Sequence, residues 1–118
     1  MGIDAVDVER FRRLMARRPL LAERIFTDTE RSSLSARLDP VPGLAARFAA
    51  KEATMKALGT GLGGVRFADV EVVSGGSGAP RLEISGLAAS RAEALGIRCW
   101  HVSLTHTCSV AAAVVVAD

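Results

Sequence analysis

Short apolar runs alternate along the chain with longer stretches of helical character, and this pattern predicts a mixed α and β domain. Alternating or continuous apolar runs typical of strands cover residues 2–6, 65–73, 80–84, 98–105 and 109–116. Helical spacing, capping signals or alanine-rich composition predict helices over residues 8–17, 27–38, 43–58 and 86–95. The helix over residues 43–58 is the longest and the most central of these elements.

Polar residues and prolines mark where the predicted helices begin and end. Asp7 precedes the first helix as its N-cap, and Pro19 ends that helix. Thr27 and Glu30 have the spacing of a capping box, so we expect them to start the second helix and to serve the fold. Residues 39–43 contain two prolines and a glycine, and they predict a rigid connector that leads into the central helix.

The central helix combines an apolar stripe with charged residues. At 100° per residue, the stripe consists of Leu44, Phe48, Met55 and Leu58. Lys51 falls inside this stripe. On a neighbouring face, Glu52 precedes Lys56 by four residues, which is the favourable order for an ion pair within a helix. Two ionisable groups, Lys51 and Glu52, therefore lie on or beside a surface that should be packed.

Length, charge and cysteine content narrow the class of protein. The 118 residues suffice for a single domain, residues 1–118, and a net charge of +2 gives no reason to expect nucleic-acid binding. No apolar run is long enough to span a bilayer, and no signal peptide opens the sequence. Cys99 and Cys108 lack metal-site spacing, so we expect free thiols and a cytoplasmic protein. Lys51 and Lys56 are the only lysines among 15 basic residues, which reflects either chance or a need for compact ammonium groups.

Two carboxylates on separate elements are candidate metal ligands. Asp4 lies in an apolar strand, where an unpaired carboxylate is costly, and Glu52 lies on the central helix. Carboxylates are the hard oxygen ligands that Mg²⁺ accepts beside substrate phosphates. Lys56, Arg47 and the backbone N–H groups of residues 59–61 could bind the phosphates. The pattern favours Mg²⁺ and phosphates, although Asp4 could equally serve as an N-cap or a strand-end residue.

The first predicted helix carries a basic face. Arg10, Arg13 and Arg17 recur at helical spacing, and Arg12 and Arg18 lie close by. Such a face is usually only solvated, but it also complements an acidic partner and would speed association with it. Both interpretations stay open on these residues alone.

Three motifs together resemble those of the 4'-phosphopantetheinyl transferases, and more narrowly those of the holo-acyl-carrier-protein synthase type. The pattern F-x-x-K-E-A-x-x-K-A-L-G-x-G is matched by Phe48, Lys51, Glu52, Ala53, Lys56, Ala57, Leu58, Gly59 and Gly61. The pattern G-I-D-x-V-x-x-x-R is matched by Gly2, Ile3, Asp4, Val6 and Arg10. Residues 103–106, S-L-T-H, are close to the family's S-L-S-H. The motifs stand in the expected order and span nearly the whole chain.

The resemblance implies both a fold and an activity. The fold is α+β, with a small antiparallel sheet packed against the long central helix. The activity is the Mg²⁺-dependent transfer of 4'-phosphopantetheine from coenzyme A to a serine hydroxyl of an apo acyl carrier protein, with release of 3',5'-ADP. The carrier protein would be acidic and would belong either to fatty-acid biosynthesis or to a secondary pathway. The resemblance also implies a homotrimer whose active sites are shared between subunits.

The same resemblance assigns roles to individual residues. Asp4 and Glu52 would bind the metal. Residues implied to contact the carrier protein are Arg10, Arg13 and Arg17, and those implied to contact coenzyme A are Arg47, Lys56, Gly59, Gly61, Pro80 and His106. The base for the serine stays open between Glu52, a water on the metal, and Lys51, whose apolar setting would lower its pKa. Lys51 could instead extend its charged end to solvent from the edge of the stripe.

Two alternative functions remain on the sequence alone. The chain could be a non-catalytic module that binds an acidic protein through its arginines, with Glu52 and Lys56 as an ordinary helix ion pair. It could also be another Mg²⁺-dependent phosphotransferase or a nucleotide hydrolase, which would turn over ATP without a carrier protein.

Overall fold

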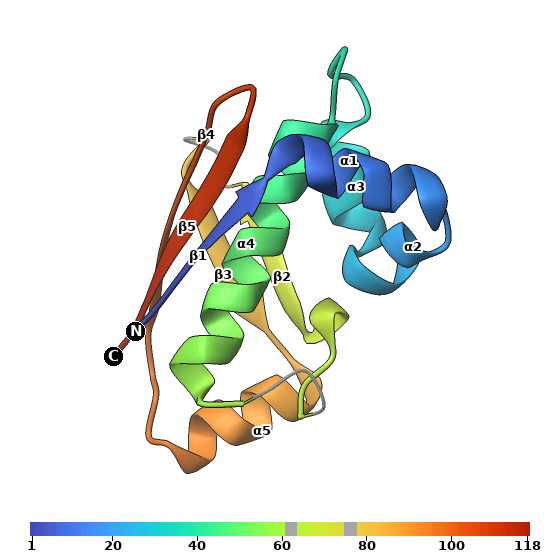
Figure 1. The fold of residues 1–118 in the computed structure, drawn as a ribbon. Coiled ribbons are helices and arrows are strands. Elements are labelled where there is room, and N and C mark those ends of the chain that lie inside the picture. The colour runs from blue at the N-terminus through green and yellow to red at the C-terminus, as the bar shows by residue number, and fades with distance from the viewer. Residues whose placement is uncertain (61–63, 75–77) are drawn as a thin grey trace.

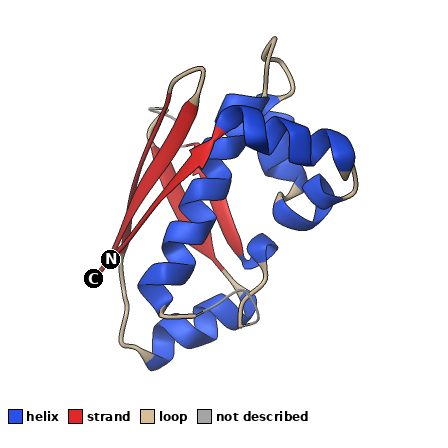
Figure 2. Cartoon of the chain, viewed as in Figure 1, coloured by secondary structure: helices blue, strands red, loops and turns tan. Residues whose placement is uncertain are grey.

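The computed structural model describes residues 1–60, 64–74 and 78–118. The long helix α4 (Val41–Leu58) lies against an antiparallel sheet, and shorter helices gather at both of its ends (Figures 1 and 2). Helices α1 (Val8–Arg17), α2 (Leu21–Ile25) and α3 (Asp28–Leu34) lie at its N-terminal end, and α5 (Gly86–Ala94) lies at its C-terminal end. None of the described helices is long and apolar enough to cross a membrane.

The described strands form two antiparallel ladders. Strands β1 (Gly2–Asp7), β5 (Val110–Ala117) and β4 (Trp100–His106) pair in the order β1-β5-β4. Strands β2 (Val70–Ser74) and β3 (Pro80–Ile84) form a second ladder, and β3 lies beside β4. The expected antiparallel sheet against the central helix is therefore confirmed, with the strands divided between two ladders.

Local capping signals are formed as the sequence predicts. Oδ1 of Asp7 accepts a hydrogen bond from N–H of Arg10 at 2.8 Å and caps α1. Oγ1 of Thr27 accepts from N–H of Glu30 at 3.2 Å, and Oε1 of Glu30 accepts from N–H of Thr27 at 2.9 Å. Helix α3 ends at Leu34 and does not reach residue 38, because serine hydroxyls in this segment bond to nearby backbone carbonyls and compete with the helical pattern.

The segment predicted as a strand over residues 65–73 is a strand only in its second half. A 3₁₀ turn, η1 (Phe67–Asp69), precedes β2, which begins at Val70. The carbonyl oxygens of Phe67 and Val70 accept hydrogen bonds from Nζ of Lys51. This long-range contact turns the backbone toward α4, and the apolar spacing of the segment does not reveal it.

Helix α4 is buried on almost every side, so the single apolar stripe expected from the sequence is too narrow. Its fully buried small residues are Ala45, Ala46, Ala49, Ala50 and Ala53. They let neighbouring backbone approach closely: a Cβ built on Gly2 of β1 would lie 1.8 Å from the carbonyl oxygen of Ala53. The helix starts two residues earlier than predicted, because Pro42 is compatible with a first helical turn.

Candidate active site

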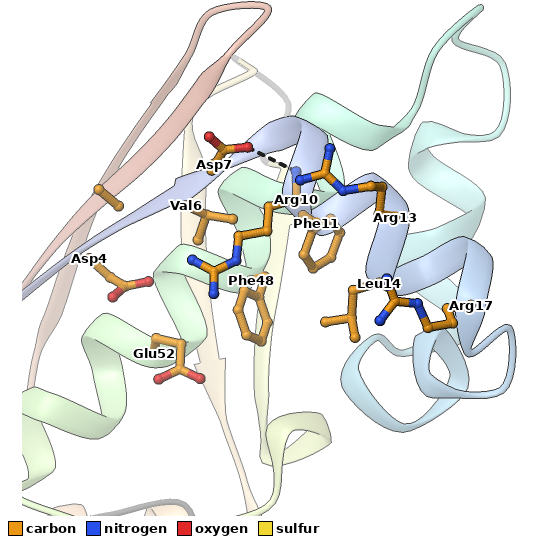
Figure 3. Close-up of a pocket in the computed structure, with 11 residues that line it drawn as sticks. Asp4, Val6, Asp7, Arg10, Phe11, Arg13, Leu14, Arg17, Phe48 and Glu52 are labelled. Atoms are coloured by element: carbon orange, nitrogen blue, oxygen red, sulfur yellow. Dashed lines mark hydrogen bonds between the residues drawn. The ribbon is translucent and has the colours of Figure 1, made fainter.

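A cavity of about 620 Å³ lies between β1, α1 and the middle of α4 (Figure 3). Its lining residues are Asp4, Ala5, Val6, Asp7, Arg10, Phe11, Arg13, Leu14, Arg17, Phe48 and Glu52. The two carboxylates and three of the arginines that the sequence singles out therefore share one cavity, with apolar side chains between them.

Asp4 reaches the cavity because it occupies an inward-facing position of β1. Its side chain is 18% exposed, and Oδ1 lies 3.0 Å from Nζ of Lys56. The same ammonium donates to the carbonyl oxygen of Ile3 at 2.9 Å. The predicted ion pair between Glu52 and Lys56 is not formed, because β1 lies so close to α4 that Asp4 and Ile3 bind Lys56 instead. Asp4 is thus a paired carboxylate in an apolar strand.

Glu52 faces the same cavity from α4 and is half-buried. Burial raises the pKa of Glu52, the negative charge of Asp4 raises it further, and Lys56 lowers it. In the described part of the chain, Lys56 forms its ion pair with Asp4 and no cation forms one with Glu52. Among the described residues, Asp4 therefore has an ion-pair partner and Glu52 has none, although arginines of α1 line the same cavity.

This donor set fits a divalent cation that needs few protein ligands. A cation between Asp4 and Glu52 would relieve the repulsion that raises the pKa of Glu52. Residues 1–60, 64–74 and 78–118 contain no group of three or more His, Cys, Asp or Glu that could hold a metal. Two carboxylates suit Mg²⁺, which keeps waters and binds substrate phosphates, better than Zn²⁺, which requires three or four protein ligands.

Lys51 does not reach the cavity, and its position contradicts the role of base that the sequence left open for it. Its side chain is 0% exposed, and Nζ lies 2.8 Å from Oε1 of Glu30, which is equally buried. Nζ also donates to the carbonyl oxygens of Phe67 at 3.0 Å and Val70 at 2.5 Å. Burial lowers the pKa of Lys51, and Glu30 opposes this effect. All three ammonium protons have acceptors, so Lys51 neither extends to solvent nor has a proton site open to substrate.

Arg47 is also buried, on the side of α4 that faces away from Glu52. Five positions along a helix rotate a side chain by about 140°, and Arg47 does not line the cavity. Its guanidinium donates to the carbonyl oxygen of Gly43 at 3.4 Å and to Oγ of Ser74 at 3.3 Å. Its Nε is buried without a partner among the described residues. Within one chain, Arg47 therefore cannot reach an anion bound beside Lys56, contrary to the expectation.

The glycine turn after α4 serves the helix itself. Gly59 has φ of 70°, and its N–H donates to the carbonyl oxygen of Lys56 at 3.1 Å. This N–H is therefore not free to bind a ligand, which corrects the expectation drawn from the sequence. Gly61, the other predicted contact in this turn, lies outside the described residues.

Pro80 and His106 lie apart from the carboxylates. Pro80 begins β3 opposite Ser74, the residue that Arg47 contacts, and the exposed His106 ends β4. Neither residue lines the cavity. Within one chain the predicted coenzyme A contacts thus lie apart: Lys56 is beside the carboxylates, and Arg47 lies with Pro80 at the end of the β2–β3 ladder where Ser74 pairs with Pro80. His106 is at the end of β4.

The basic face of α1 opens onto the cavity. In Figure 3, the side chain of Arg10 extends toward the carboxylate end, with Arg13 and Arg17 farther along the helix. Leu14, which helical spacing assigns to the core, is 37% exposed and lies among these arginines. The sequence missed Leu14 because a core leucine and a surface leucine share the same spacing. The one sequence signal that Leu14 lies on the basic face is its position one helical turn from both Arg10 and Arg17.

Comparison with known proteins gives a result that agrees with this geometry. A family model described as the 4'-phosphopantetheinyl transferase superfamily matches residues 1–114. The chain belongs to this superfamily. Holo-acyl-carrier-protein synthases from Streptomyces griseus and Frankia casuarinae are 49% and 50% identical to this phosphopantetheinyl transferase over 118 residues. These alignments cover 100% of this chain and 96% and 95% of the two relatives.

Solved structures of such synthases share the fold over nearly the whole transferase chain. The crystal structure from Neisseria meningitidis is 34% identical with a TM-score of 0.89, and the alignment covers 99% of this chain and 95% of that one. The structure from Helicobacter pylori, solved in complex with coenzyme A, is 27% identical with a TM-score of 0.86, and the alignment covers 99% of this chain and 98% of that one.

We expect Glu52→Gln to stabilise the metal-free transferase at neutral pH. Folding raises the pKa of Glu52, so the folded state holds this proton more tightly, and the contribution to stability is lost as pH rises through the folded pKa. The gain from the substitution should therefore be present near pH 7 and vanish below the pKa of an unfolded glutamate, about 4.3. Screening by solvent keeps this gain below about 1 kcal/mol. Thermal unfolding between about pH 4 and pH 8 with a chelator present measures it.

The control for this measurement is Glu93→Gln, which removes an exposed carboxylate on α5. It should show no gain that depends on pH. A Glu52→Gln variant that is equal to or less stable than the wild type at neutral pH would contradict the prediction.

Proposed function

We propose that this chain transfers 4'-phosphopantetheine from coenzyme A to a serine hydroxyl of an apo acyl carrier protein. The observation that carries the proposal is the meeting of Asp4, Glu52 and the α1 arginines in one cavity. The chain that has this geometry shares 49% and 50% sequence identity, over its whole length, with two holo-acyl-carrier-protein synthases.

The reaction needs a site that binds a diphosphate and accepts a proton. The serine oxygen forms a bond to the β-phosphorus of coenzyme A, and the bond from this phosphorus to the bridging oxygen breaks. The electron pair of the broken bond stays on 3',5'-ADP, which leaves. The serine proton passes to a base. Positioning and charge neutralisation supply most of the rate enhancement in reactions of this kind.

Asp4 and Glu52 are the residues that would hold Mg²⁺. A cation bound there would neutralise charge on the diphosphate and orient it. Lys56 lies beside Asp4, where its ammonium would attract the same phosphates. In this arrangement Lys56 would bind the diphosphate, and Asp4 would bind the cation.

Glu52 is our choice for the group that accepts the serine proton. Of the three acids that line the cavity, Asp7 caps α1 through Oδ1 and Asp4 pairs with Lys56. Glu52 has no ion-pair partner among the described residues, so its carboxylate is the one of the three that is open to accept a proton. Lys51, the other side chain considered, has no access to the cavity.

The basic face of α1 supports docking of an acidic carrier protein. Arg10, Arg13 and Arg17 line the cavity beside the carboxylates, so a partner bound there would present its serine close to the diphosphate. Leu14 offers an apolar contact among these charges. A mixed surface of arginines around an apolar side chain is typical of protein interfaces.

A homotrimer is the assembly that we propose. The outer face of the β1-β5-β4 sheet presents apolar side chains: Ile3 is 65% exposed, Val110 47% and Val114 38%. Arg47 and Pro80 lie away from the cavity of their own chain, so a neighbouring chain is the means by which they could reach the same coenzyme A. A site completed by a second copy explains both observations.

The first test is the intact mass of an apo acyl carrier protein after incubation with coenzyme A and Mg²⁺. We expect the wild type to add roughly 340 Da, the mass of a phosphopantetheine group transferred in this reaction. Glu52→Ala should slow this transfer at least about 100-fold, because it removes a metal ligand and the proton acceptor. A chelator should abolish the transfer.

Glu93→Ala, a change of an exposed carboxylate away from the cavity, is the control and should keep wild-type activity. No mass gain with several folded carrier proteins would favour the non-catalytic binding module. Turnover of ATP without a carrier protein would favour another phosphotransferase.

The docking surface is tested by the double variant Arg13→Ala/Arg17→Ala. Both side chains line the cavity but lie farther from the carboxylates than Arg10 in Figure 3. We expect KM for the carrier protein to rise on the order of 10-fold with kcat nearly unchanged, because long-range attraction is lost. The difference should shrink at high salt. Steady-state kinetics at low and high salt measure both effects.

Arg98→Ala removes an exposed arginine outside this cavity and should leave KM unchanged. An equal rise in KM in this control, or none in the double variant, would show that the α1 face is only solvated.

The trimer is tested by Val114→Lys, which puts a charge in the middle of the outer sheet face. The cost of burying an unpaired ammonium in an apolar interface should dissociate the assembly. Light scattering should then give a trimer mass for the wild type and a monomer mass for the variant, with activity lost in the monomer.

The matched control is Leu38→Lys, at a fully exposed leucine on the connector after α3. It should stay trimeric. A wild type that is monomeric at all concentrations and fully active would overturn the proposed assembly.

A further inference from the structure

Alanines supply much of the apolar surface that α4 buries. Small, fully buried side chains cover much of its surface, namely Ala45, Ala46, Ala49, Ala50 and Ala53. Alanines make no directed contacts, so their packing constrains the rotation of the helix less narrowly than hydrogen bonds do. The larger apolar side chains of α4 near these alanines are Phe48, which packs against Phe11 and Phe67, and Met55.

A buried polar cluster on one side of α4 adds directed contacts that constrain the rotation of the helix. Lys51 and Glu30 are both fully buried, with 2.8 Å between Nζ and Oε1. Oε2 of Glu30 accepts from N–H of Val72 at 2.9 Å, and Oε1 also accepts from N–H of Thr27 at 2.9 Å. With the bonds of Lys51 to the carbonyl oxygens before and at the start of β2, the cluster ties α3, α4 and β2 together.

We propose that Glu30 and Lys51 are positioning residues, whose buried ion pair fixes the rotation of α4 and thereby aims Glu52 into the cavity. This inference rests on the proposed function, in which Glu52 binds the metal and accepts the serine proton. Glu52 follows Lys51 directly in the sequence, so any rotation that the ion pair allows is transmitted to it.

The expected sensitivity follows from helix dimensions. Side-chain ends lie about 5 to 6 Å from the axis of an α-helix, so a rotation of about 10° moves them by roughly 1 Å. A displacement of about 1 Å at a reacting group can lower the rate about 100-fold. A small loss of register in α4 would therefore leave the fold intact and impair the reaction.

Stability alone gives a weak reason for this ion pair. Replacing a buried pair of charges with apolar residues of similar volume is often neutral or stabilising, whereas removing one partner is strongly destabilising. The best-supported use of such pairs is to specify one arrangement among several. The directed geometry fits that use, because three acceptors converge on the three protons of Lys51.

The test is the double variant Glu30→Gln/Lys51→Met, studied in the full-length protein with coenzyme A, Mg²⁺ and carrier protein. The amide introduced at position 30 keeps one oxygen, which can accept from one of the two backbone N–H groups that Glu30 binds, and both charges are removed together. We expect kcat to fall about 10- to 100-fold, with KM for the carrier protein within about twofold because the α1 arginines are untouched. The melting temperature should fall, because the carbonyl oxygens of Phe67 and Val70 and one backbone N–H lose their partners, and the control below is chosen to match that loss of stability.

A second readout does not depend on activity. Hydrogen exchange of the amides of residues 50–55 should become faster in the double variant relative to amides in β5, since α4 can then change its rotation while the sheet stays intact. Ile97→Ala, which removes apolar packing beside α5, is the control for lost stability. It should lower the melting temperature and leave kcat and the exchange in the middle of α4 unchanged.

Wild-type kcat in the folded double variant would overturn the inference, and so would an equal loss of kcat in Ile97→Ala. If the double variant does not fold, Glu30→Asp takes its place, because it keeps both charges and shortens the carboxylate arm; an unchanged kcat there would also overturn the inference. Glu52→Ala is measured in parallel. If it retains full activity, the proposed role of Glu52 has failed, which is a different outcome from a failure of the positioning role.

Discussion

The burial of α4 on nearly all sides is the constraint on which the rest of the structure depends. Strands cover one side of α4 and helices lie at both of its ends, and the run of alanines in its first half and middle lets neighbouring backbone come close. The close approach of Gly2 to Ala53 is a direct consequence. Because β1 lies this near, Asp4 comes within reach of Lys56 and faces the same cavity as Glu52. The site therefore depends on residues that contribute no chemistry.

The two lysines show two ways of keeping a charge on a buried helix. Lys51 is removed from water and is compensated by a carboxylate and two carbonyl oxygens. Lys56 stays exposed and pairs with Asp4, so its charge remains available to a ligand. A compact ammonium with rotatable donors suits acceptors that converge from different directions, whereas a planar guanidinium does not. The other 13 basic residues of the chain are arginines, and these two positions have a physical reason to differ.

Sequence reasoning predicted interactions between near neighbours and missed those that join distant segments. Asp7 caps α1, and Thr27 and Glu30 form their capping box, because both interactions involve residues three positions apart. The spacing of α4 correctly put Lys51 among core residues. It could not show that Glu30, 21 residues earlier, would neutralise the charge, so extension to solvent and catalysis were considered instead. The ion pair of Lys56 was missed for the same reason, since its partner is 52 residues away.

Arg47 is the residue that most favours the proposed site between two chains. Its buried Nε has no partner among the described residues. Burial lowers the pKa of Arg47, and the nearby charge of Arg37 lowers it further. A buried, incompletely paired guanidinium is costly for a chain on its own. An anion supplied at that end of the structure would compensate it, and the phosphates of coenzyme A are such an anion. In the proposed trimer, a coenzyme A molecule bound between two chains could meet both requirements, because Glu52 and Arg47 face different sides of the same helix. The exposed Ile3 and Val114 on the outer sheet face give those chains a surface on which to pair.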